Sequence, residues 1–82
     1  MANKKTNDMV DDLYKELRHC NFIYSGRPHQ IRESGFTFIR RANKKIQPKL
    51  FNALVEWMEH NCPRSPVTQE LKDKGVECMN SL

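Results

Sequence analysis

The clearest structural signal in the chain is the stretch PKLFNALVEWMEH, residues 48–60, which predicts a helix. Pro48 suits the first helical position because the amide hydrogen that proline lacks has no partner there. The apolar residues recur at helical spacing and are Leu50, Phe51, Leu54, Val55, Trp57 and Met58. This apolar face is wider than one neighbour needs, so we expect it to be covered from two directions, by other elements or by another chain. Trp57 and Met58 are therefore candidates either for the core or for the centre of a protein interface.

A second helix is predicted on the N-terminal side, over residues 7–20. Thr6 or Asn7 suits its N-cap, and acidic residues follow in the first turns, where the helix dipole favours negative charge. One apolar stripe of this helix comprises Val10, Leu13, Tyr14 and Leu17.

A third helix is predicted on the C-terminal side, over residues 65–80. Ser65 followed by Pro66 is typical of a helix start. Val67 and Leu71 would lie on its buried face, while Gly75 weakens it by roughly 1 kcal/mol relative to alanine.

The segment between the first two helices favours a short β-hairpin. Phe22-Ile23-Tyr24 is a β-prone run and is followed by turn residues. After Gly35, Phe36 and Phe38 alternate with polar or branched residues, as in a strand. The alternative is a single helical turn over residues 28–34, closed by Gly35.

The expected fold is therefore α+β and mainly helical. It has three short helices, over residues 7–20, 48–60 and 65–80, with the hairpin between the first and the second. Residues 1–6 are expected to be a flexible tail, and residues 7–82 a single small domain.

Length and composition narrow the classes of function. The chain has 82 residues, of which 38% are hydrophobic, and this leaves little core for a large catalytic cavity. Its apolar runs are only a few residues long, too short to cross a bilayer, and no secretory signal is recognisable. Three cysteines form an odd set, which favours reduced thiols in a cytoplasmic protein.

Positive charge is concentrated in the middle of the chain. The formal net charge is +4, yet residues 27–49 hold seven basic residues against the single acid Glu33, which leaves +6 in this segment alone. Lys and Arg attract phosphates, and aromatic rings such as Tyr24, Phe36 and Phe38 stack on exposed bases. The residues predicted to contact a nucleic acid or protein partner are Arg27, Arg32, Arg40, Arg41, Asn43, Lys44, Lys45 and Lys49.

Within this segment Asn43 and Gln47 are candidates for reading base edges, while Arg41 and Lys44 hold phosphates. The competing interpretation places the aromatic rings in the core and the basic residues on a solvated face. An acidic protein surface would suit the same positive patch equally well.

The order of a basic strand, a helix beginning at Pro48 and a helix beginning at Ser65 is similar to that of ribbon-helix-helix repressors. In that family apolar residues alternate up to the helix. Here Lys45 and Gln47 occupy those positions and Ile46 is out of step, so the sequence is not assigned to the family.

Signals for catalysis or metal binding are weak. No nucleophile elbow or glycine-rich phosphate loop is present, so no enzyme activity and no cofactor are expected. The histidines and cysteines lack C-x-x-C or H-x-x-x-H spacing, so no metal site is predicted. The side chains that could serve as ligands are His19, Cys20, His29, His60, Cys62 and Cys78.

The sequence therefore predicts a small basic binding module with a regulatory role, which contacts nucleic acid or a nucleic-acid-handling complex. The alternative is an inhibitor or adaptor of the kind that phages and mobile elements encode, docking on a host enzyme through its basic segment and its apolar helix. A homodimer is compatible with either function, and no membrane contact is expected.

Overall fold

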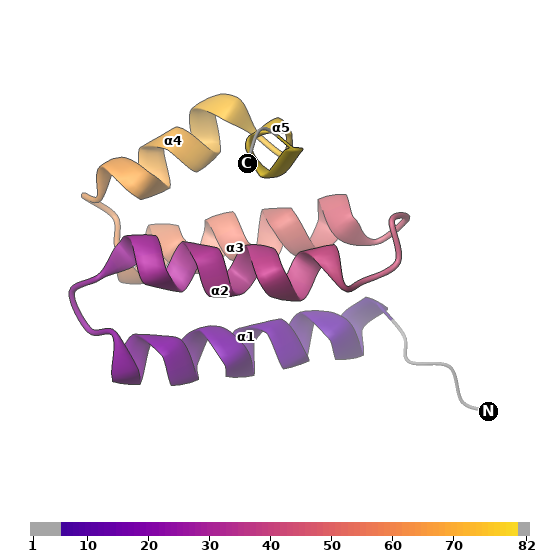
Figure 1. Cartoon of the computed structure of the whole chain (residues 1–82), viewed down its shortest axis with the longest axis horizontal. Coiled ribbons are helices and arrows are strands. Elements are labelled where there is room, and N and C mark those ends of the chain that lie inside the picture. The colour runs from indigo at the N-terminus through magenta and orange to yellow at the C-terminus, as the bar shows by residue number, and fades with distance from the viewer. Residues whose placement is uncertain (1–5, 81–82) are drawn as a thin grey trace.

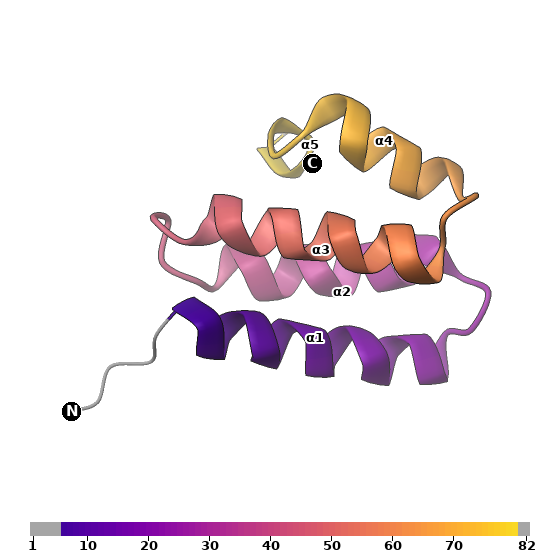
Figure 2. The same ribbon diagram turned by 180° about the vertical axis from the view of Figure 1, so that it is seen from behind.

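The computed structural model describes residues 6–80, which form helices joined by short connections. In chain order these are α1 (Thr6–Ile23), α2 (Pro28–Arg40), α3 (Gln47–Asn61), α4 (Pro66–Lys74) and α5 (Glu77–Asn80). The first three run antiparallel to their neighbours in the sequence, and α4 lies over α2 and α3 (Figures 1 and 2). None of the described helices is long and apolar enough to cross a membrane.

The predicted β-hairpin is wrong, because residues 6–80 contain no strand and the fold is all-α rather than α+β. The segment predicted as the second strand of the hairpin forms the C-terminal half of α2. This helix has Pro28 in its first turn, where proline is well tolerated. Ile31, Gly35 and Ile39 recur every four residues and are buried together with Phe36. Burial of this helical stripe outweighs the β-propensity of the run around Phe36, since β-propensity depends strongly on context.

The other predicted boundaries also shift. Phe22 and Ile23 end α1, three residues beyond the expected limit, and Tyr24 N–H donates to the Cys20 carbonyl at 2.6 Å. Gly75, at φ 66°, ends α4 and separates it from α5, so the third expected helix is divided in two. Of the expected tail, Thr6 begins α1, and residues 1–5 lie outside the described part of the chain.

The wide apolar face of α3 is covered within the chain itself. The helix spans the predicted stretch 48–60 and packs against α1, α2 and α4. Leu54 and Met58 are fully buried, and Val67 and Leu71 bring α4 onto the same core. The sequence left open whether other elements or another chain cover this face, and here other elements do.

The connection between α3 and α4 is held by two side chains. Ser65 Oγ caps α4 by accepting the Val67 N–H at 3.1 Å. Buried Thr68 donates its hydroxyl to the Cys62 carbonyl at 2.7 Å, and this carbonyl also accepts the Ser65 N–H at 3.2 Å.

Replacing Thr68 by valine is expected to lower the free energy of unfolding by about 1 kcal/mol, because valine keeps the volume but removes this hydrogen bond. Urea denaturation measures the effect. Thr37→Val is the matched control, since the exposed Thr37 hydroxyl bonds only to the Glu33 carbonyl one turn earlier in α2. Equal losses in the two variants would show that the buried bond does not hold the connection.

Candidate functional site

The structure divides the predicted basic segment among three places. Arg27 lies in the connection between α1 and α2, at the opposite end of α2 from Arg40 and Arg41 (Figure 1). Arg32 lies within α2 and is mostly buried, and its guanidinium bonds to Glu33 at 2.9 Å and to Glu70 at 3.1 Å. Because Glu70 belongs to α4, Arg32 joins two helices and is not free to contact a partner.

The remaining basic residues stay together in residues 40–49, which we call the basic loop. It includes the end of α2, the connection, and the start of α3. No acid occurs in these ten residues, while the basic ones are Arg40, Arg41, Lys44, Lys45 and Lys49. All five are exposed, and the last four form no ion pair with any residue in the described part of the chain.

Arg40 is fixed more tightly than the other four. Its guanidinium donates to the Met79 carbonyl at 3.4 Å and stands 5.8 Å from the centre of the Phe36 ring. It therefore ties α2 to α5 while remaining exposed at the edge of the basic loop.

Asn43 and Gln47 were candidates for reading base edges. In the structure their side chains form hydrogen bonds to the backbone of the basic loop. Asn43 Oδ1 accepts the Lys45 N–H at 2.9 Å, and its carbonyl accepts the Ile46 N–H at 3.0 Å. The Gln47 side-chain amide donates to the Ala42 carbonyl at 3.1 Å. These bonds close a tight connection and keep Lys44 and Lys45 in a defined, exposed position.

The three aromatic rings that were candidates either for base stacking or for the core lie in different places. Phe36 is 1% exposed and stacks on Phe51 in the core, with ring centres 6.3 Å apart. Phe38 is half-buried and lines a hollow of about 260 Å³ between α1 and α2, together with Arg41 of the basic loop. Tyr24 lies beyond the far end of α1. None of these three rings is therefore both exposed and beside the cations of the basic loop.

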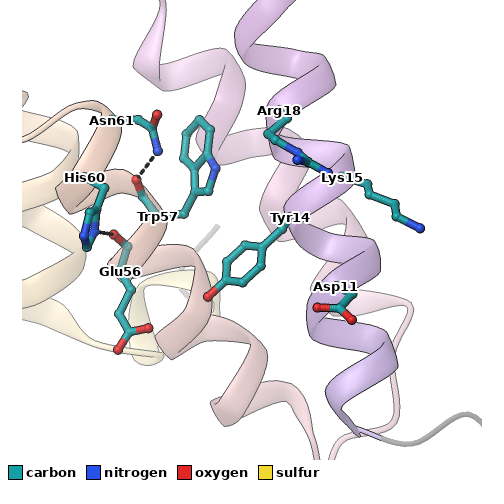
Figure 3. A pocket seen from close by; sticks show the side chains of 8 residues that line it. All are labelled: Asp11, Tyr14, Lys15, Arg18, Glu56, Trp57, His60 and Asn61. Carbon is teal, nitrogen blue, oxygen red and sulfur yellow. Dashed lines mark hydrogen bonds between the residues drawn. The ribbon is translucent and has the colours of Figure 1, made fainter.

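Of the two predicted interface residues, Met58 is fully buried and presents no surface. Trp57 is 9% exposed and lines a hollow of about 520 Å³ between α1 and α3. In Figure 3 Tyr14 reaches from α1 toward α3, and Trp57 reaches from α3 toward α1. The sequence placed Tyr14 on the apolar stripe of its helix but gave no sign that the ring would border an open hollow.

The rim of this hollow is balanced in charge. Asp11 and Glu56 contribute carboxylates, and Lys15 and Arg18 contribute cations. Burial, and then the carboxylates of Glu56 and Asp11, raise the pKa of Tyr14 above its usual value. Such a rim offers complementarity to a polar partner but no general attraction for a polyanion.

The cysteines and histidines form no site in the described part of the chain. No group of three or more His, Cys, Asp or Glu side chains that could hold a metal ion occurs there. Burial raises the pKa of the Cys20 and Cys62 thiols, which disfavours the reactive thiolate. The Cys78 side chain lies outside the described residues.

No protein-family model matches the chain, and comparisons with characterised proteins and with solved structures found no match.

Proposed function

We propose that the chain is a small binding module whose basic loop contacts the phosphate backbone of a nucleic acid. The observation that carries the proposal is the local composition of residues 40–49, with five exposed cations and no acid. By contrast, Lys72 and Lys74 on α4 both pair with glutamates. A compact group of unpaired cations attracts phosphates through charge and through the release of counterions.

The shape of the basic loop supports this proposal. Lys44 and Lys45 project from a connection whose backbone is fixed by Asn43 and Gln47. Arg41 adds a planar guanidinium that suits bidentate contact with a phosphate. Because these cations are already held together, less conformational entropy is lost when they bind than in a flexible basic tail.

The double variant Lys44→Ala with Lys45→Ala tests the proposal. We expect affinity for a labelled oligonucleotide at low salt to fall roughly 10- to 100-fold, and the slope of log affinity against log salt to flatten by about 2. Fluorescence anisotropy over a salt series measures both quantities.

The matched control is Lys72→Ala with Lys74→Ala, which removes the same charge from α4, where both lysines are ion-paired. This control is expected to change affinity much less. Equal losses in both double variants would reject the basic loop as the contact and leave only an effect of net charge. Absence of nucleic-acid binding by the unaltered chain at low salt would reject the proposal.

A protein-binding adaptor is the second candidate, and the hollow between α1 and α3 is the observation that favours it. Trp57, Tyr14 and Arg18 line this hollow, and these residue types are enriched at the centres of protein interfaces. The apolar face of α3, which was expected to dock on a host enzyme, is mostly buried in the core of the chain itself. This burial weakens the case for a protein-binding adaptor. A native complex that keeps its mass after nuclease treatment would favour it over nucleic-acid binding.

A further inference from the structure

The end of α1 exposes a group of large apolar side chains. Phe22 is 85% exposed, Ile23 53% and Tyr24 37%. The core residues of the described part of the chain are, by contrast, buried from solvent. The turn beneath them is defined, because Arg27 N–H donates to the Tyr24 carbonyl at 2.9 Å and Gly26 takes a φ of 79° that favours glycine. Apolar side chains gathered in this way mark a surface that meets a partner.

The charge around these side chains indicates which kind of partner. Residues 18–29 and 60–66 form the two connections and helix ends at this end of the bundle (Figures 1 and 2). Neither segment contains an Asp or Glu. Their arginines make no ion pair in the described part of the chain, although Arg18 also lines the hollow whose rim carries Asp11 and Glu56. The basic residues of the two segments are Arg18, Arg27, Arg64, His19, His29 and His60.

The spacing on α1 places a cation beside a ring. Arg18 and His19 precede Phe22 by four and three residues, so they share its helix face at roughly 5–6 Å between Cβ atoms. A nucleotide in an open strand presents a base and a phosphate at similarly short range, so one face can stack the base and bind the phosphate. The end of α1 thus pairs cations with an exposed ring, whereas Phe38, the ring beside Arg41 of the basic loop, is half-buried.

We propose that this aromatic end, comprising Phe22, Tyr24, Arg18 and Arg27, binds single-stranded nucleic acid by stacking unpaired bases on its rings. The inference rests on the proposed function and adds the form of nucleic acid that the chain selects. Bases in a duplex are covered by their neighbours and offer no free face to Phe22, whereas every base of a single strand does. The basic loop contacts phosphates of either form.

The test compares a labelled oligothymidylate of about 15 nucleotides, close to the upper size of single-strand sites, with a duplex of the same length. Phe22→Ala is expected to weaken single-strand binding roughly 5- to 150-fold, the range for loss of one stacked base, and to leave duplex binding unchanged. Because Phe22 is highly exposed, the variant keeps the fold, which its circular dichroism and melting temperature verify.

Two further variants separate stacking from apolar docking. Phe22→Leu keeps an apolar side chain but removes the ring, so it is expected to bind the single strand as poorly as Phe22→Ala. Phe22→Trp keeps a ring and is expected to bind at least as tightly as the unaltered chain. If Phe22→Leu binds the single strand as tightly as the unaltered chain, no aromatic ring is required and the stacking proposal is overturned.

The outcomes also distinguish this inference from the proposed function. If Phe22→Ala has no effect while Lys44→Ala with Lys45→Ala weakens binding, the inference is overturned and the proposed function stands. If neither single-stranded nor duplex probes bind at low salt, both fail.

Discussion

Replacing Phe36 by alanine is expected to lower the free energy of unfolding by about 3–5 kcal/mol. The side chain is almost completely buried and stacks on Phe51. The guanidinium carbons of Arg32 and Arg40 lie 5.6 Å and 5.8 Å from the centre of its ring. Alanine therefore leaves a cavity between α2 and α3 and removes the ring against which two arginines rest.

Urea denaturation measures this loss, with Phe22→Ala as the matched control. The same substitution at the exposed Phe22 is expected to change stability by less than about 0.5 kcal/mol, as surface substitutions usually do. In a small domain with a stability of roughly 5–15 kcal/mol, the Phe36 loss is a large fraction of the total. A cost below about 1 kcal/mol at Phe36 would indicate that its ring is not packed in the core.

This contrast explains why α2 was not predicted. Phe36, Thr37 and Phe38 form a β-prone run after a glycine, and a short window shows only that local pattern. The helical signal spans a longer distance, from Pro28 at the first position to the buried Ile31, Gly35 and Ile39. In α3, by contrast, the apolar residues themselves recur at helical spacing, so its position was predicted to within one residue at each end.

The candidate site was predictable only where the cations are close in both sequence and space. Residues 40–49 are the end of α2, one short connection and the start of α3, so the count of charges there holds in the folded chain. A helix the length of α2 rises roughly 20 Å, which separates Arg27 from Arg40. The ion pair between Arg32 and Glu70 joins residues that are 38 positions apart in the chain, so no local sequence pattern predicts it.

The exposed rings at the end of α1 show the same limit. Phe22 and Tyr24 are of residue types common in protein cores. Only the packing of the rest of the chain shows that both side chains are exposed to solvent. What a sequence cannot show is which apolar residues the core has room for.

Leu54→Ala is expected to lower the free energy of unfolding by about 2–5 kcal/mol, since Leu54 is fully buried in α3. Its methyl groups fill the space beside Gly35, where an added Cβ would lie 2.9 Å from Leu54 Cδ1 and 3.1 Å from Cδ2. Gly35→Ala alone is therefore expected to cost about 1 kcal/mol, because the crowding exceeds the helix propensity that alanine adds.

The double variant Gly35→Ala with Leu54→Ala measures the energetic coupling between these two residues. Once Leu54 is alanine, the two crowding methyl groups are gone, and Gly35→Ala is expected to raise stability by about 1 kcal/mol through helix propensity alone. The two single effects would then fail to add by about 2 kcal/mol, within the range for residues in direct contact. Urea denaturation of the four proteins measures the cycle. Additive effects would mean that α2 and α3 do not meet at Gly35, so that this glycine is not what allows the helices to pack closely.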